Sequence, residues 1–386
     1  MYEFQIIAGD GHPAKIRTGA AMLLRIGRFI SIYLTARTLS LMLCALFAGC
    51  IVLRLNAKAT AAVSIKRSEH ITLDGTKMYL LTRGADRSAP VLLWLHGGPG
   101  GAERPLFRYF NSELENHFVV VYWDQRGAGR SFDPKADPHR LTIAQHVVDL
   151  DAVVDHLRQT LGKDKIILMG HSWGAALGLL YAQAHPDKVS AFIGVNPVVS
   201  TREGQQAEYD FVLAEASRRN DNGALAHLGK IGPPPYKNVG QVLAMEELVQ
   251  RYGGVFHKEP RRTWIMVRAI FSGLVTPWEI PRLIHANNVS LEAMNEELLG
   301  LDLARSVPST GVPVLFFLGR YDRHTDGELA ATYFATLYAP LKRLVWFENS
   351  AHNVPFEEPR LFNVTVVREL QSIGVGLAAG EGVQRK

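Results

Sequence analysis

After residue 64, short apolar runs alternate with amphipathic segments along the chain. Apolar residues are nearly continuous at 91–95, 118–123 and 165–169, a pattern typical of strands that helices cover on both faces of a sheet. Residues 144–161 instead place apolar side chains at helical spacing. Further strands are predicted at 191–195, 312–318 and 343–347. This alternation predicts an α/β fold with one mainly parallel, twisted sheet and helices on both faces.

Two local patterns depart from this alternation. Segments 69–73 and 77–82 flank the turn dipeptide Asp74-Gly75, which predicts an antiparallel hairpin. From about residue 198 the strands stop, and candidate helices follow at 209–219, 239–252, 261–272 and 291–299. We therefore expect an N-terminal segment over 1–63, an α/β core over 64–197 and 307–386, and an inserted helical cap over 198–306.

The N-terminal segment contains an uncharged apolar stretch. Residues 38–53 form about 24 Å of helix, against about 30 Å for a hydrocarbon core, and the flanking Arg37 and Arg54 can snorkel to make up the difference. We expect a hydrophobic helix that associates with a membrane as an anchor or directs export, which places the protein in the cell envelope. The cytoplasmic face of a membrane, and an extension on a cytoplasmic enzyme, are the alternatives.

Charge and cysteine content narrow the possible functions. The formal net charge is +5, but residues 1–67 hold nine basic and two acidic side chains, so the remainder is near neutral. No basic stripe indicates a nucleic-acid partner. Both cysteines, Cys44 and Cys50, lie in the N-terminal segment. The predicted core and cap therefore have no disulfide framework and no thiolate metal site, and we predict no metal centre.

The most specific motif is Gly170-His171-Ser172-Trp173-Gly174, which follows the strand at 165–169 and precedes a predicted helix at 175–184. A serine at so sharp a strand-to-helix turn is exposed above the sheet, and the flanking glycines relieve the crowding. This pattern predicts a nucleophile elbow with Ser172 as the nucleophile. We interpret His171 as structural, because the neighbours of an elbow serine point away from it.

A serine nucleophile needs a base, and the base needs an orienting carboxylate. In this fold they follow the serine along the chain as acid and then histidine, each after a strand. Asp322 follows the strand at 312–318, and His352 follows the strand at 343–347. We predict that His352 is the general base and Asp322 its orienting anion. Asp326 is the alternative acid, although its place beyond the turn favours a helix-cap role.

A glycine-rich loop, His96 to Gly101, follows the strand at 91–95. Backbone N–H groups there can stabilise the oxyanion that forms in acyl transfer. We predict that the donors are Gly98, with Gly97 as second choice, and Trp173, which directly follows the nucleophile. No Gly-Lys-Ser/Thr ends the loop, so it is not a phosphate-binding loop.

Three motifs together resemble the prolyl iminopeptidase branch of the α/β-hydrolase superfamily: the HGGPG run at 96–100, the DQRGxGxS pattern at 124–131 and the elbow. The resemblance implies an α/β-hydrolase fold and a cofactor-free hydrolase that releases an N-terminal residue, often proline. Arg126 would then brace its loop or contact the substrate. His171 stands where these peptidases more usually carry glycine.

The resemblance also implies glutamates in the cap that hold the free amino group of the substrate, but no segment of the cap aligns to them. The sequence therefore does not identify the residues that bind the substrate. The available cap glutamates are Glu203, Glu208, Glu215, Glu246, Glu247, Glu292, Glu296 and Glu297.

Together these features predict a serine hydrolase that cleaves an amide or ester in a small molecule or short peptide, through an acyl-enzyme. Its activity is expected to resemble that of a proline iminopeptidase. The alternatives are an esterase or lactonase with the same triad, and a non-catalytic ligand-binding homologue on the same fold.

Overall fold

The computed structural model describes residues 63–258, 264–265, 267–268, 275–276 and 278–375, which belong to one compact unit that begins at Val63. The predicted hydrophobic helix at 38–53 and most of the predicted helix at 261–272 lie outside the described residues. In the part of the chain that is described, no helix has the length and apolar character needed to cross a membrane.

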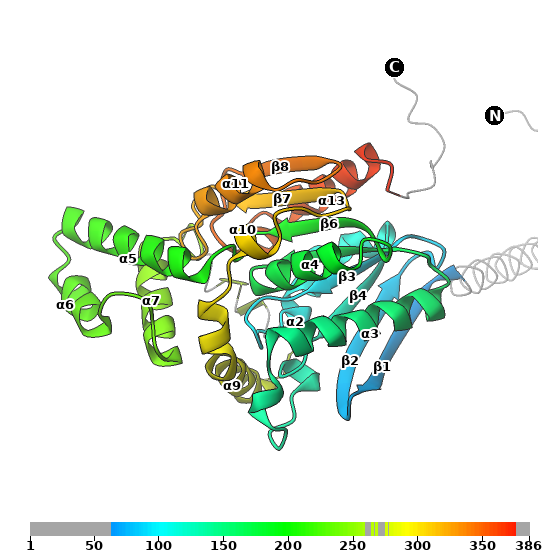
Figure 1. Cartoon of the computed structure of the whole chain (residues 1–386), viewed down its shortest axis with the longest axis horizontal. Helices are drawn as coiled ribbons and strands as arrows, with labels where there is room; N and C mark the ends of the chain where they lie inside the picture. Colours follow the sequence, from blue (N-terminus) through cyan, green and yellow to red (C-terminus); the bar gives the residue numbers. More distant parts are fainter. Residues whose placement is uncertain (1–62, 259–263, 266, 269–274, 277, 376–386) are drawn as a thin grey trace, which may run out of the picture. The chain divides into compact units, whose positions relative to one another are not determined.

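The centre of the fold is a single sheet whose eight described strands lie in the order β1-β2-β4-β3-β5-β6-β7-β8 (Figure 1). The strands from β3 to β8 pair in parallel, whereas β1 and β2 form the predicted antiparallel hairpin and β2 pairs antiparallel with β4. The strand bounds are β1 Ile65–Leu73, β2 Thr76–Gly84, β3 Val91–Leu95, β4 Val119–Asp124, β5 Ile166–His171, β6 Val189–Val195, β7 Val314–Gly319 and β8 Lys342–Phe347.

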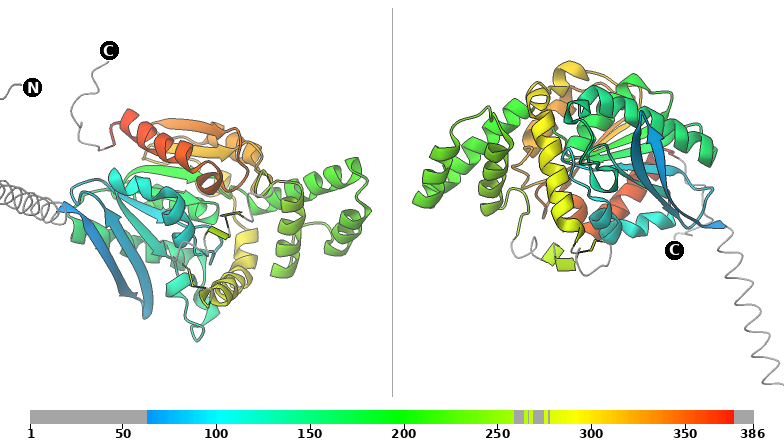
Figure 2. Two further views of the ribbon diagram at one scale, coloured as in Figure 1. Left: turned by 180° about the vertical axis from the view of Figure 1, so that it is seen from behind. Right: turned by 90° about the horizontal axis from the view of Figure 1, so that it is seen from below.

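Helices cover both faces of the sheet, as the continuous apolar strands predict (Figure 2). In β3, Leu93 and Leu95 pack in one hydrophobic cluster, and Leu92 and Trp94 in another. The first cluster includes residues of α3 (Ile143–Leu161), α4 (Trp173–Ala184) and α11 (Gly327–Thr336). The second includes residues of α2 (Arg104–Asn111), α12 (Val354–Glu357) and α13 (Pro359–Ser372). The predicted α/β class, with a mainly parallel sheet between helices, is confirmed.

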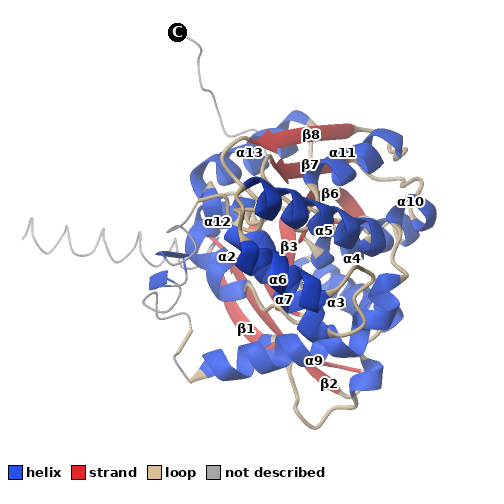
Figure 3. Ribbon diagram, turned by 90° about the vertical axis from the view of Figure 1, so that its left-hand side faces the viewer, coloured by secondary structure: helices blue, strands red, loops and turns tan. Residues whose placement is uncertain are grey.

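Between β6 and β7 the chain forms the helices of the predicted cap (Figure 3). They are α5 Thr201–Arg218, α6 Asn222–Ile231, α7 Val239–Arg251, α9 Glu279–Leu299 and the short α10 Leu303–Ser306. Side chains of α5, α6 and α7 share a third hydrophobic cluster that is separate from the two beside the sheet. The division into core and cap at 198 and 306 stays a prediction.

Two cap helices begin earlier than their apolar spacing predicts: α5 at Thr201 rather than at 209, and α9 at Glu279 rather than at 291. The buried residues in the first turns of α5 are Gly204, Gln205 and Glu208. Because these residues are small or polar, an apolar periodicity does not reveal them. In α9 the described buried positions are Ala286, Ser290 and Met294. The two that precede residue 291 are again small or polar, so the apolar spacing does not reveal the first turns of this helix.

Candidate active site

Ser172 lies at a sharp turn between β5 and α4, with φ 55° and ψ −119°. A positive φ is strained for a residue with a Cβ and is found where the surroundings enforce it. A Cβ on Gly170 would lie 2.2 Å from the carbonyl oxygen of Gly174, and a Cβ on Gly174 would lie 2.2 Å from that of Leu95. Both glycines of the motif are therefore required sterically, as the predicted elbow demands.

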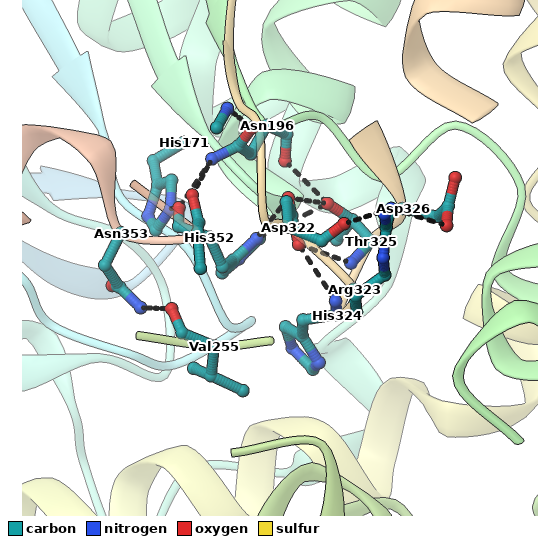
Figure 4. A network of polar contacts seen from close by, with 12 residues as sticks. His171, Asn196, Val255, Asp322, Arg323, His324, Thr325, Asp326, His352 and Asn353 are labelled. Carbon is teal, nitrogen blue, oxygen red and sulfur yellow. Dashed lines mark hydrogen bonds and ion pairs between the residues drawn. The ribbon is translucent and has the colours of Figure 1, made fainter. Parts of the chain in front are cut away.

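His352 and Asp322 lie side by side (Figure 4). Nδ1 of His352 is 3.0 Å from Oδ2 of Asp322. The Asp322 carboxylate also accepts hydrogen bonds from the backbone N–H groups of His324 and Thr325 and from the Thr325 hydroxyl, at 2.9, 3.2 and 2.9 Å. Burial raises the pKa of Asp322, but the charge and hydrogen bond of His352 outweigh it and lower that pKa. An ionised Asp322 holds the proton of neutral His352 on Nδ1, so that Nε2 is left as the basic nitrogen.

The alternative acid, Asp326, has a different role. Its side chain accepts a hydrogen bond from the backbone N–H of Leu329 at 2.9 Å and caps the N-terminus of α11. Of the two carboxylates that follow β7, the structure brings Asp322 to His352, and Asp326 serves as the expected helix cap.

A cavity of about 700 Å³ lies over the elbow, and its wall includes Ser172, His352, Gly97, Gly98 and Trp173. A volume of this size is typical of sites for small ligands. Five of the six predicted site residues therefore face one space, while the sixth, Asp322, is fully buried behind His352.

The predicted oxyanion loop approaches the nucleophile closely. A Cβ on Gly97 would lie 3.3 Å from the Cβ of Ser172, so a larger residue would crowd the serine. Within the described ranges, the backbone N–H groups of Gly98 and Trp173 donate no hydrogen bond to another residue. Both donors are therefore free to bind an oxygen atom in the cavity.

Hydrogen bonds from His96 and Gln125 hold this loop in place. Nε2 of His96 accepts the backbone N–H of Gln125 at 3.0 Å, so the proton of His96 is on Nδ1, which donates to the Gly97 carbonyl at 2.8 Å. Burial lowers the pKa of His96 and keeps it in this neutral form. The Gln125 side chain also accepts the indole N–H of Trp173 at 3.1 Å. The two predicted donor segments are thus tied to one another.

Arg126 has the bracing role that the sequence left open. Its guanidinium makes two hydrogen bonds with Asp149, at 2.6 and 2.7 Å, and a third with the Thr76 hydroxyl at 2.5 Å. Its side chain is 5% exposed, and Arg126 lies outside the wall of the cavity over Ser172. Arg126 therefore links its loop to α3 and the hairpin.

Of the eight candidate cap glutamates, Glu208 and Glu246 line the cavity. Glu208 is buried on α5 and bonds to Nδ1 of His324 at 2.7 Å. Glu246, on α7, is half-buried and makes no hydrogen bond or ion pair with another described residue. Glu103 also lines the cavity and bonds to Nδ1 of His171 at 2.7 Å.

Glu103 and His324 were not predicted as site residues, and His171 was interpreted as structural. Glu103 comes just after the glycine-rich loop, and His324 comes two residues after Asp322. This closeness to predicted site residues is the feature of the sequence that could have identified them. In the described part of the chain, no group of three or more His, Cys, Asp or Glu side chains is placed to hold a metal ion.

Comparison with known proteins gives the family. A family model described as the alpha/beta hydrolase fold matches residues 90–227. The chain is 33% identical over 307 residues to the probable aminopeptidase YbaC of Bacillus subtilis, and the match covers 79% of this chain and 96% of YbaC. It is 27% identical over 299 residues to the proline iminopeptidase of Saccharolobus solfataricus, covering 73% and 84% of the two chains.

The solved structure of a proline iminopeptidase-related protein from Thermus thermophilus has the same fold, with a TM-score of 0.57 at 19% identity over 80% of this chain and 98% of that one. The motifs, the sheet order and the long match to an aminopeptidase agree with one another. The chain therefore belongs to the α/β-hydrolase family and is an enzyme of its prolyl iminopeptidase-like branch.

Proposed function

We propose that Ser172, His352 and Asp322 are a catalytic triad that cleaves an amide or ester through an acyl-enzyme. The observation that carries this proposal is the 3.0 Å bond from His352 Nδ1 to the buried Asp322, with His352 and Ser172 in the wall of one cavity. An oriented base that shares a cavity with a serine hydroxyl is the arrangement that activates serine.

The proposed reaction begins when Nε2 of His352 takes the proton of the Ser172 hydroxyl, and Oγ adds to the substrate carbonyl carbon. The N–H groups of Gly98 and Trp173 bind the resulting oxyanion. His352 then gives its proton to the leaving amine or alcohol as the C–N or C–O bond breaks. Water, deprotonated by His352, attacks the acyl-enzyme and releases the acid and free Ser172.

For the substrate we propose a short peptide or amide with a free amino terminus. The relatives named aminopeptidase and proline iminopeptidase support this class. Glu246 supports it independently, because a half-buried carboxylate without a partner in the cavity can bind an ammonium group. Glu208 is already engaged with His324, so Glu246 is the residue we assign to the substrate amine.

Paired substrates test this assignment. We expect the enzyme to hydrolyse a prolyl arylamide and to reject the same compound acetylated on nitrogen. E246Q should raise KM for the free-amine substrate about tenfold or more, since hydrogen bonds to charged groups contribute about 1.5–3 kcal/mol. E247Q is the matched control, because Glu247 is exposed on the same helix and lies outside the cavity wall. Equal hydrolysis of both arylamides would contradict the proposal.

An esterase or lactonase activity is the second candidate, and the apolar part of the cavity wall favours it. This part could hold an acyl chain, and its members are Leu106, Val198, Val239, Val242, Leu243, Phe256, Leu283, Ile284, Leu291 and Leu298. A higher kcat/KM for a short p-nitrophenyl ester than for the prolyl arylamide, with no effect of E246Q on either, would favour this function.

We further propose that residues 38–53 associate the protein with a membrane or direct its export. This proposal rests on the uncharged stretch between Arg37 and Arg54 alone. The full chain should stay with the membrane fraction after washing with alkaline carbonate, or should be found outside the cytoplasm. Recovery of the full chain in the cytoplasmic fraction without detergent would contradict it.

A further inference from the structure

Two other histidines flank the ring of His352. The ring centroid of His171 is 4.7 Å from that of His352, and the ring of His324 stands nearly perpendicular to it at 4.8 Å. Each flanking ring bonds to a glutamate, His171 to Glu103 and His324 to Glu208. One of these Glu–His pairs belongs to the predicted core, and the other connects the cap to the loop after β7.

The hydrogen-bond partners of His171 favour its charged form. Its Nδ1 lies 2.7 Å from a Glu103 carboxylate oxygen, and its Nε2 lies 2.9 Å from the backbone carbonyl oxygen of His352. A carbonyl oxygen and an ionised carboxylate both accept, so beside them both ring nitrogens donate, which only the imidazolium can do. Burial opposes this charge, but Glu103 raises the pKa of His171 above its usual value. His171 therefore holds the backbone of His352 and places a positive charge beside its ring.

His324 is held in the same way from the cap. Its Nδ1 bonds at 2.7 Å to Glu208, whose side chain is 8% exposed on α5. Burial opposes the charge on His324, but the hydrogen bond and charge of Glu208 raise its pKa to about 9. The backbone N–H of His324 also bonds to Asp322 at 2.9 Å. His324 is thus a cation at neutral pH, fixed to the carboxylate that orients the base.

We propose that His171 and His324 are positioning residues that act as two fixed cations around the base His352, each held by its own glutamate, Glu103 or Glu208. This proposal rests on the proposed serine hydrolase function. The two positive charges disfavour a third on His352, so the base stays unprotonated and competent in acid. They also make protonated His352 a stronger acid toward the leaving group. Because Glu208 belongs to α5, the charge on His324 depends on the cap being in place.

Charged groups from several elements surround this cluster. They are Asp322 and His324 from the loop after β7, His171 from the end of β5, Glu103 before α2, Glu208 on α5 and Glu246 on α7. Two more lie behind them: Arg323, which pairs with Asp326, and the buried Glu357, which accepts the backbone N–H groups on either side of His352. Burial lowers the pKa of His352, Asp322 opposes this, and the charges of His171 and His324 lower it further, to about 4. The placement of the rings and the shift of this pKa therefore both favour an unprotonated His352.

The dependence of kcat/KM on pH tests the proposal, because its acid limb reports the base of the free enzyme. We expect the wild-type limb well below pH 6.5. H324Q and E208Q should each move it upward by about one pH unit or more, since a fixed charge at such a distance shifts a pKa by that amount. H324K, which restores a cation, should move the limb back toward the wild-type position. H227Q, at a cap histidine outside the cavity wall, is the control and should leave the limb in place.

A purely structural role for the two pairs would lower kcat/KM equally at every pH and leave the limb unmoved, which would overturn the proposal. The wild-type profile needs no variant to fold, and a limb near pH 6.5 would overturn it as well. A different result would contradict the proposed serine hydrolase function, namely an S172A variant that retains activity. A Ser172-dependent activity with an unshifted limb would therefore contradict only the role of the flanking cations.

Discussion

Replacing Asp322 with Asn tests the arrangement around the base most sharply, because the structure determines how the new amide must lie. Oδ1 of Asp322 accepts two backbone N–H groups, from His324 and Thr325. In D322N the amide oxygen must stay there, since an NH₂ group cannot accept these bonds. The NH₂ group then takes the place of Oδ2, opposite Nδ1 of His352. Nδ1 of His352 must then accept a hydrogen bond from the amide, so the ring proton moves to Nε2. A proton on Nε2 prevents His352 from taking the proton of Ser172.

The substitution also removes a charge that stabilises the imidazolium formed during catalysis. At the 3.0 Å separation of the two atoms and an effective dielectric constant of about 20, the attraction is roughly 5 kcal/mol. Since about 1.4 kcal/mol corresponds to a tenfold change in rate, we expect kcat to fall by about 10³–10⁴-fold. KM should change little, because Asp322 is fully buried and does not line the cavity.

Steady-state hydrolysis of a prolyl arylamide or a p-nitrophenyl ester measures this loss, with thermal unfolding as the check on folding. D326N is the matched control, because Asp326 caps α11 and Asn caps helices equally well. It should keep nearly full activity. A D322N enzyme with more than about a tenth of wild-type kcat, or a D326N enzyme with the larger loss, would refute the assignment of the acid.

Three further predictions concern stability. The free energy of unfolding of G174A should fall by about 3 kcal/mol, or the variant should fail to fold, because its Cβ would overlap the Leu95 carbonyl. G229A has open space around the new Cβ in α6, so its free energy of unfolding should rise by about 0.5–1 kcal/mol. Equal urea midpoints for the two variants would contradict this. R126M should cost about 3–5 kcal/mol by leaving Asp149 buried without its partner, with KM unchanged if Arg126 only braces its loop. The pKa of His324 rises from about 6.5 unfolded to about 9 folded, so its ion pair stabilises fully below pH 6.5 and this stability is lost as pH rises through 9. The urea midpoint should therefore fall from pH 6.5 to 9 by more in wild type than in H324Q, and equal falls would refute this sign.

The sheet and the elbow could be predicted from sequence because their causes are local. A strand covered on both faces must be apolar throughout, so β3 is visible as the run at 91–95, and its observed bounds, Val91–Leu95, agree. The elbow needs glycine where a Cβ would strike a carbonyl oxygen, and this requirement is visible as Gly170 and Gly174. The order of the acid and the histidine after their strands follows from the same topology.

The Glu–His pairs around the base could not be predicted, because their partners are distant in the chain. Glu103 and His171 are 68 residues apart, and Glu208 and His324 are 116 residues apart. The Glu208–His324 pair also depends on how α5 packs beside the loop after β7, and the first buried turns of α5 carry polar residues that give no apolar signal. For the same reason the cavity carboxylate Glu246 could not be separated from the seven other cap glutamates before the structure.

The central claim is that Ser172 is a nucleophile activated by His352, and covalent labelling tests it most directly. The enzyme should be treated with a fluorophosphonate, digested, and analysed by mass spectrometry to locate the adduct. We predict a single adduct on Ser172 in the wild-type enzyme, a much slower reaction in H352Q, and none in S172A. An adduct elsewhere, or undiminished labelling of a folded S172A enzyme, would contradict the account.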